Sequence, residues 1–207
     1  MSKTRAQARP KTRIQHQNEA TILDAALEVF SAAGFRGATV DEIAATCGMS
    51  KPNLLYYFRR KEDIYVAVLE RTLQDWLAPL QTLDADADPI AELTRYITAK
   101  LDMSFANPAA SRLFANEILH GAPHIGTFLK GHLKDMVDRK AVVISAWVDA
   151  GKISRVDPYH YIFAIWAVTQ HYADFSVQVS TLLGPRLNSD ATRKEVLNIL
   201  LGTVKLS

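Results

Sequence analysis

The sequence predicts an all-α protein in which short N-terminal helices precede a larger helical domain. Apolar residues recur every three or four positions along most of the chain, as they do on one face of an α-helix. No stretch alternates apolar and polar residues in the manner of a β-strand. Glycines and prolines fall between the periodic segments, where helices end or begin.

The composition narrows the classes of protein that this can be. With 207 residues and 48% apolar content, the chain is long enough to bury two cores. Because no run of 18 or more apolar residues occurs and the N-terminus lacks an apolar signal segment, we expect a cytoplasmic protein without a membrane span. The single Cys47 cannot form an internal disulfide, and we expect it to pack as a small apolar residue rather than to sense redox state.

Charge is distributed unevenly along the chain. Residues 1–61 hold ten Lys and Arg against five Asp and Glu, whereas the remainder holds fourteen against seventeen. The N-terminal part is therefore suited to a polyanion such as DNA. We expect residues 1–17 to form a disordered basic arm, which could enter a minor groove or could serve solubility alone. Its basic residues are Lys3, Arg5, Arg9, Lys11 and Arg13.

The first helix is predicted from one apolar face and a terminal glycine. Leu23, Ala26, Leu27 and Phe30 share the face, and Gly34 is expected to end the helix. Such a helix can support the two that follow.

Residues 39–61 have the features of a helix-turn-helix. Thr39 and Glu42 form a capping box, in which each side chain accepts a backbone N–H at the start of the first helix. Gly48 ends that helix, and Ser50 caps the second.

The second helix is expected to present polar and aromatic groups outward. Leu54 and Phe58 are four residues apart and point inward, so the remaining side chains are free to enter a DNA major groove. The outward side chains are Lys51, Asn53, Tyr56 and Tyr57.

This segment resembles the helix-turn-helix of the TetR family of one-component repressors. The matching residues are Gly48, Met49, Ser50, Leu54, Tyr56, Phe58, Lys61 and Glu62. Leu55 and Tyr57 depart from the pattern, because the family commonly has tyrosine and histidine at these positions.

The resemblance implies that six residues contact double-stranded DNA, three at phosphates and three at base edges. Thr39, Tyr56 and Lys61 would hold phosphates. Lys51, Asn53 and Tyr57 would face base edges, although both tyrosines could instead pack against neighbouring helices. We accordingly expect a helix-turn-helix DNA-binding domain over residues 18–61 and a ligand-binding and dimerisation domain over residues 62–207.

Later helices are marked by their apolar faces and their ends. Leu69, Leu73, Trp76 and Leu80 share one face of the fourth helix, which Pro79 is expected to end or kink. A short acidic loop, residues 84–88, should be solvated. Three further helices should begin at a capping Asp or Asn followed by proline: Asp88–Pro89, Asn107–Pro108 and Asp157–Pro158. Glycines should end helices over roughly 125–150 and 158–183, and a last helix is expected over 189–204.

The last two helices carry more apolar residues than a small domain needs, so we expect them to join two copies of the chain. A two-fold dimer places two reading helices one or more DNA turns apart, which predicts a near-palindromic operator. The apolar residues in question are Ile162, Ile165, Val196, Leu197, Leu200 and Val204.

Trp166 and Gln170 are candidates for a ligand site. They are four residues apart in an apolar helix, where an indole can stack on a flat heterocycle and an amide can pair with its polar edge. Both could equally be structural, with Trp166 filling the core and Gln170 bonding a backbone carbonyl.

Several segments strengthen the ligand hypothesis, because they are similar to a pyrimidine-utilisation subgroup of the TetR family. They are residues 53–58, 76–80, 110–114, 121–123 and 166–175. That subgroup represses an operon for pyrimidine breakdown and is released from DNA by uracil or thymine. The resemblance implies a pocket containing Trp76, Trp166 and Gln170, with Glu117 and Arg112 as further polar members.

Glu117 has a simpler interpretation as one member of a salt bridge. Lys100 and Arg112 are near enough in sequence to be its partners. If Glu117 faced the cavity instead, its carboxylate could accept a ring N–H of the ligand.

Other functional classes are disfavoured. His120 and His124 are separated by Gly121, Ala122 and Pro123, which interrupts the helical spacing that a metal site uses, and we find no Ser-His-Asp set or phosphate-binding glycine loop. We therefore expect neither an enzyme nor a bound cofactor. The alternative that stays open is a TetR-type repressor that responds to a different planar nucleobase-like or drug-like ligand.

Overall fold

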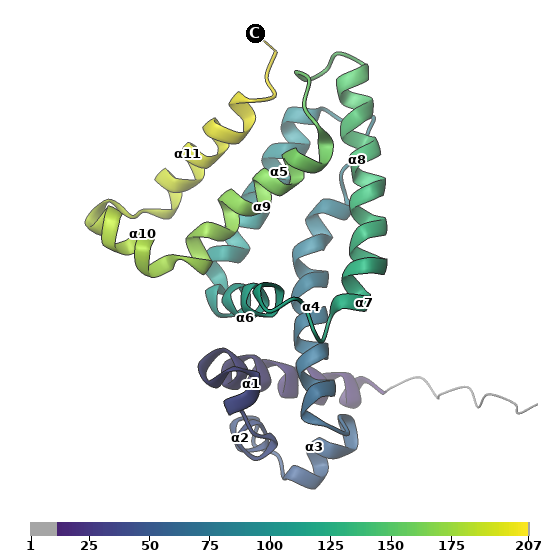
Figure 1. Ribbon diagram of the computed structural model, residues 1–207, viewed down its shortest axis with the longest axis vertical. Coiled ribbons are helices and arrows are strands. Elements are labelled where there is room, and N and C mark those ends of the chain that lie inside the picture. The colour runs from purple at the N-terminus through teal and green to yellow at the C-terminus, as the bar shows by residue number, and fades with distance from the viewer. Residues whose placement is uncertain (1–11, 207) are drawn as a thin grey trace, which may run out of the picture. The chain divides into compact units, whose positions relative to one another are not determined.

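The computed structural model describes residues 12–206, and over this range it consists of helices and loops without a strand (Figure 1). The all-α prediction is confirmed. The chain divides into two compact units, Met1–Val68 and Leu69–Ser207. The division falls after Val68 rather than after residue 61, where we expected the DNA-binding domain to end.

The N-terminal unit contains three helices and the start of a fourth. These are α1 (Arg13–Gly37), α2 (Val40–Thr46), α3 (Lys51–Tyr57) and the first turns of α4 (Lys61–Gln81). Ile64 and Tyr65 of α4 are buried, and the Tyr65 ring packs edge-on against Phe30 of α1 with centroids 5.0 Å apart. This packing places the first turns of α4 in the N-terminal core.

The start of α1 differs from the predicted arm. Thr12 and Gln15 form a capping box, with Gln15 Oε1 accepting the Thr12 N–H at 2.8 Å, so residues 13–17 are helical rather than disordered. The other basic residues assigned to the arm, Lys3, Arg5, Arg9 and Lys11, lie outside the described residues. Gly34 interrupts α1 as expected, since its φ of +68° is not helical.

The C-terminal unit contains the rest of α4 and the elements that follow it. These are α5 (Pro89–Ala106), α6 (Pro108–Leu119), α7 (Gly126–Phe128), the π-helical η1 (Leu129–Leu133), α8 (Lys134–Asp149), α9 (Pro158–Asp174), α10 (Ser176–Leu183), the 3₁₀ turn η2 (Gly184–Arg186) and α11 (Ser189–Gly202). α5 and α9 pack against each other, and both contact α6 and α11. Tyr96, Ile97 and Leu101 of α5 and Ile162 and Ile165 of α9 are buried in this core.

The predicted helix starts are confirmed, and two predicted helices prove to be interrupted. Asp88, Asn107 and Asp157 each accept a backbone N–H in the first turn of the helix they cap. The helix expected over 158–183 breaks at Phe175, and the helix expected over 125–150 contains the π-helical turn. α4 continues past Pro79 to Gln81.

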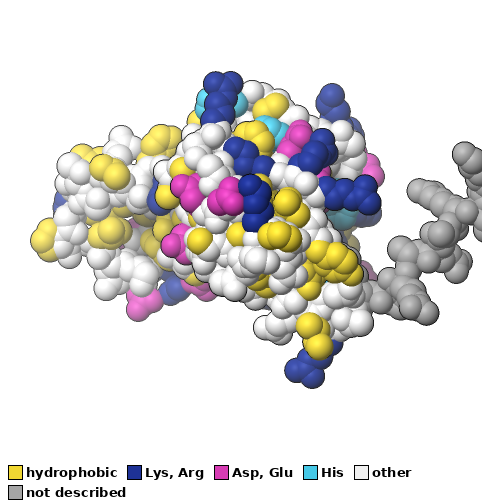
Figure 2. Space-filling view, turned by 90° about the horizontal axis from the view of Figure 1, so that it is seen from below, with side chains coloured by type: hydrophobic (Ala, Val, Ile, Leu, Met, Phe, Trp, Pro, Cys, Tyr) yellow, Lys and Arg dark blue, Asp and Glu magenta, His cyan; other side chains and the backbone are white. Residues whose placement is uncertain are grey.

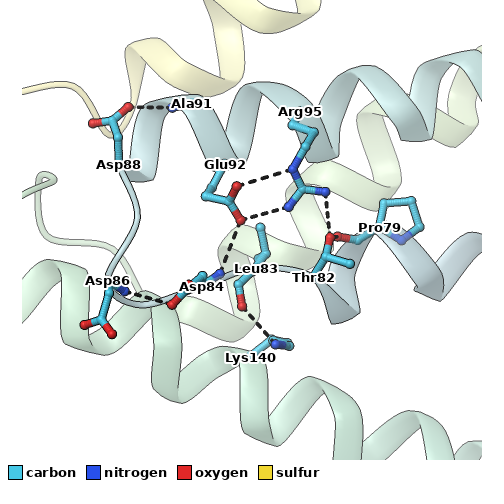
Figure 3. Close-up of polar contacts among 10 residues, drawn as sticks. All are labelled: Pro79, Thr82, Leu83, Asp84, Asp86, Asp88, Ala91, Glu92, Arg95 and Lys140. Carbon is cyan, nitrogen blue, oxygen red and sulfur yellow. Dashed lines mark hydrogen bonds and ion pairs between the residues drawn. The ribbon is translucent and has the colours of Figure 1, made fainter.

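The loop between α4 and α5 is ordered by polar contacts (Figure 3). Asp84 Oδ1 accepts the Asp86 N–H, and the Asp84 N–H donates to Glu92, which is also paired with Arg95 at 2.8 Å. Lys140 of α8 donates to the Leu83 carbonyl at 2.9 Å. The carboxylates of this loop are exposed, as expected, and they also organise the start of α5.

Two further features of residues 12–206 bear on function. None of the described helices has the length and apolar content needed to cross a bilayer. Over the same range, His, Cys, Asp and Glu side chains do not gather in a group of three or more that could hold a metal ion.

Candidate DNA-binding surface and ligand cavity

Side-chain caps fix the two helices of the helix-turn-helix. Thr39 Oγ1 accepts the Glu42 N–H at 3.2 Å, and Glu42 Oε2 accepts the Thr39 N–H at 2.8 Å. Ser50 caps α3 by accepting the Asn53 N–H at 3.4 Å. Gly48 has a φ of +67° in the turn between them, a conformation that glycine adopts without strain. The predicted capping box and turn are confirmed.

Three of the six candidate DNA-contacting side chains lie on the exposed side of α3. Tyr56 is 72% exposed, and Lys51 and Asn53 are also exposed. Nζ of Lys51 forms an ion pair with Asp41 at 2.9 Å. Both partners are open to solvent, so this pair is weak and its lysine can be redirected to a nucleic acid.

Two other candidates have partners within the N-terminal unit. Nδ2 of Asn18 donates to the Tyr57 hydroxyl oxygen at 2.7 Å. Lys61 Nζ donates to the carbonyls of Phe35 and Ala38, each at 2.7 Å, so only its third N–H is left for a phosphate. The sixth candidate is Thr39, which caps α2. The DNA contacts of all six residues stay predictions.

The molecular surface mixes charges of both signs. Figure 2 shows Lys and Arg side chains spread over the face in view, with Asp and Glu side chains beside several of them. In the N-terminal unit, Arg60 pairs with Asp63 at 2.8 Å, and both are at least partly exposed. This pairing lowers the pKa of the Asp63 carboxyl below its usual range.

The C-terminal unit contains a cavity of about 360 Å³ that is open on one side. This volume falls within the range of about 300–1,000 Å³ that small-molecule sites occupy. The wall is contributed by α4, α5, α6, η1 and α9. Its members are Leu73, Trp76, Leu77, Lys100, Phe114, Ile118, Leu129, Leu133, Trp166 and Gln170. Three residues predicted to bind ligand, Trp76, Trp166 and Gln170, are therefore in one cavity.

The aromatic side chains of the cavity are held by their neighbours. Trp76 packs edge-on against Phe114 with centroids 5.4 Å apart. The indole N–H of Trp166 donates to the Tyr96 hydroxyl at 2.6 Å, so Trp166 offers a ligand its ring and not its N–H. Burial raises the pKa of Tyr96, which keeps this phenol neutral.

Lys100 is a charged residue in the cavity wall that we did not expect there from the sequence. It is only 3% exposed, and its Nζ lies 4.7 Å from the centre of the Trp76 ring. Burial lowers the pKa of Lys100 to about 8, although the Asp174 carboxylate opposes this shift. The signal in the sequence that points to this position is a lysine on the same stretch of α5 as residues that are buried, such as Tyr96 and Leu101.

Glu117 and Arg112 are not among the residues that line the cavity. The Glu117 carboxylate is buried and accepts the His124 backbone N–H at 2.7 Å, with Nδ1 of the same histidine at 3.0 Å. Its side-chain partner is thus His124 rather than Lys100 or Arg112. Arg112 Nη1 donates to the Ala173 carbonyl at 3.4 Å. A direct role of either residue in ligand binding stays a prediction.

The apolar residues assigned to dimerisation are mostly packed within the chain itself. Ile162, Ile165, Val196, Leu200 and Val204 are buried, and Leu197 is half-buried. The periodicity that suggested a surface stripe therefore marked the contact of α9 and α11 with their own core. On the same two helices, Phe163 is 49% exposed and Ile199 is 60% exposed.

Comparison with known families accounts for both units. Residues 22–68 match the family described as bacterial regulatory proteins, tetR family. Residues 69–206 match the YcdC-like protein, C-terminal region. The chain belongs to the TetR family. It is a transcriptional regulator, and the regulators of this family bind operator DNA and small effectors and act as dimers.

Individual relatives agree with this assignment. The HTH-type transcriptional regulator RutR of Escherichia coli strain K12 is 46% identical over 180 residues, which cover 87% of this chain and 85% of that protein. The HTH-type transcriptional repressor NicS of Pseudomonas putida is 31% identical over 104 residues, 50% of this chain and 49% of that protein.

Solved structures share the fold of the TetR-family chain. The putative transcriptional regulator SCO4942 from Streptomyces coelicolor superposes with a TM-score of 0.69 at 24% identity, over 90% of this chain and 98% of that one. AibR, in complex with isovaleryl coenzyme A and operator DNA, gives a TM-score of 0.67 at 19% identity, over 88% and 97%.

Proposed function

We propose that this TetR-family regulator represses genes of pyrimidine breakdown and is released from its operator by uracil or thymine. The observation that carries the proposal is the cavity that contains Trp76, Trp166 and Gln170. The 46% identity to RutR supports it, since it extends over both units of the chain.

The cavity has the chemistry that a flat, polar-edged ring requires. Its wall is mostly apolar, so the faces of the ring would replace water contacts with aromatic and aliphatic ones. None of the hydrogen bonds among residues 12–206 uses the side-chain amide of Gln170. That amide offers one acceptor and one donor group, which match adjacent N–H and carbonyl groups on a pyrimidine.

The regulator would act as a homodimer on double-stranded DNA in the cytoplasm. A near-palindromic operator follows from two-fold symmetry, and the exposed Phe163 and Ile199 of α9 and α11 supply apolar surface for the contact. Each phosphate neutralised by the dimer contributes a slope of about −0.9 to the log–log dependence of affinity on salt. A flat salt response would argue against this mode of binding.

Helix α4 offers a route from ligand to DNA, because it carries Lys61 at its start and Trp76 in the cavity wall. Release requires only that uracil bind the DNA-incompetent state more tightly than the competent one. A differential affinity of about 5.5 kcal/mol would move the population from 1:99 to 99:1.

The proposal is tested by titrating the purified protein with uracil, thymine and cytosine, with calorimetry and tryptophan fluorescence as readouts. Trp76 and Trp166 line the cavity, whereas Trp147 is fully buried with its indole bonded to the Ala85 carbonyl, so quenching would report the cavity. We expect one site per chain for uracil or thymine and lower operator affinity in their presence. Binding of another planar ligand alone would support the alternative effector, and would contradict the assignment to pyrimidines.

A further inference from the structure

We propose that Lys100 and Gln170 together form a donor–acceptor–donor edge that binds the imide edge of uracil and thymine. This inference rests on the proposed function, and it assigns the hydrogen bonds made in the same cavity to two named side chains.

The first step is that the Lys100 ammonium has no hydrogen-bond acceptor among the described residues. None of the hydrogen bonds or ion pairs among residues 12–206 uses its Nζ, although the side chain is only 3% exposed. A buried ammonium without a hydrogen-bond acceptor is costly, so an acceptor supplied by a ligand would be strongly favoured there. The face of Trp76, 4.7 Å from Nζ, compensates for this in part.

The second step places Lys100 and Gln170 at the same level of two neighbouring helices. Tyr96 of α5 bonds Trp166 of α9, and further along both helices the rings of Phe105 and Tyr172 lie 5.9 Å apart. The two helices therefore run in the same direction here. Lys100 and Gln170 each follow the bonded pair by one helical turn, and both line the cavity.

The third step matches hydrogen-bonding patterns. An ammonium only donates, whereas the amide of Gln170 both accepts and donates. The wall can therefore present donor, acceptor and donor in sequence. The imide edge of uracil and thymine presents carbonyl, N–H and carbonyl, which is complementary.

The test compares wild type with Lys100→Met at pH 7 by calorimetry with uracil. We expect uracil to bind about 10- to 100-fold more weakly to the variant, because a hydrogen bond to a charged group is lost. Lys100→Gln, which keeps a donor, should lie between the two proteins.

Lys140→Met is the matched control. Unlike Lys100, Lys140 has a hydrogen-bond acceptor inside the C-terminal unit, the Leu83 carbonyl (Figure 3). It does not line the cavity. This variant should keep its uracil affinity. Unaltered operator binding and circular dichroism will show that each variant is folded.

Thiouracils report on the contact itself, because sulfur is a weaker acceptor than oxygen. One of the two imide oxygens accepts from Lys100 in this arrangement. Replacing that oxygen by sulfur, in 2-thiouracil or in 4-thiouracil, should weaken binding to wild type. In Lys100→Met the same replacement should make no difference to the affinity. Wild-type uracil affinity in Lys100→Met would overturn the inference and leave the proposed function standing. Failure of wild type to bind uracil or thymine would overturn the proposed function, and this inference with it.

Discussion

The two units of the chain hold their polar functional groups in opposite ways. Lys51, Asn53 and Tyr56 are exposed on α3, whereas Lys100 is buried in an apolar cavity. An exposed charge alters stability little, but a buried charge without a partner destabilises the folded state by several kcal/mol. The groups proposed to face DNA can therefore be changed with little effect on folding, whereas the groups proposed to bind ligand would couple folding and ligand binding.

The largest expected effect on folding is that of Lys100→Met, which should raise the free energy of unfolding at pH 7 by about 1–3 kcal/mol. The pKa of Lys100 is lowered to about 8 in the folded protein from 10.5. Below pH 8 the lysine is charged in both states, so its destabilisation is fully present. Between pH 8 and 10.5 the unfolded chain binds more protons, so wild type gains stability relative to the variant.

Urea denaturation of both proteins at pH 7 and pH 9.5 will measure this difference. The gap should shrink at the higher pH. A variant less stable than wild type at pH 7 would mean that the contact of Lys100 with Trp76 outweighs its burial, and the contrast between the units would weaken.

The next effect is on ligand affinity alone. Gln170→Leu removes an amide that has no partner among the described residues, so folding should be unaffected or improved, while uracil should bind about 10- to 100-fold more weakly. Calorimetry measures the affinity. Gln178→Leu, on the exposed side of α10, is the matched control and should behave as wild type. Weakened operator binding without ligand in Gln170→Leu would contradict a purely ligand-facing role.

A smaller effect on stability is expected when the side-chain cap of α3 is removed. Ser50→Ala removes the side chain that accepts the Asn53 N–H and should lower stability by about 1 kcal/mol. Operator affinity should fall as the helix frays, and uracil affinity should not change. A thermal melt together with both titrations checks this, and a loss of uracil affinity would show that the two units do not respond independently.

The smallest effect on folding is expected at the exposed surface. Lys51→Ala breaks only a solvent-exposed pair with Asp41, so stability should change by less than about 0.5 kcal/mol. Operator affinity should nevertheless fall about tenfold, with relaxed preference at the base that Lys51 contacts. Fluorescence anisotropy with operator variants measures both quantities. Full operator affinity would remove Lys51 from the interface.

The fold was largely predictable, because caps and glycine ends are local signals. Asp88, Asn107 and Asp157 cap the helices that were predicted from them. The break at Phe175 and the π-helical turn at Leu129–Leu133 were not predictable, since neither contains a proline or a capping side chain.

The site was predictable only in part, because burial is a tertiary property. Trp76, Trp166 and Gln170 were assigned to one pocket through the resemblance, and they line one cavity. The sequence suggests Lys100 only as a partner of Glu117, because the spacing of residues does not show which side of a helix faces an internal space. The same limit applies to α11, whose Val196 and Leu200 were assigned to an interface and lie in the core.

The small number of polar residues in the cavity wall has a practical consequence for engineering. Eight of its ten residues are apolar or aromatic, so the hydrogen-bonding pattern that a ligand meets is set largely by Lys100 and Gln170. A library that varies these two codons would sample new recognition patterns, while changes at Leu73, Ile118 and Leu133 would adjust size. Coupled to a reporter gene, such a library could convert this regulator into a sensor for other small heterocycles.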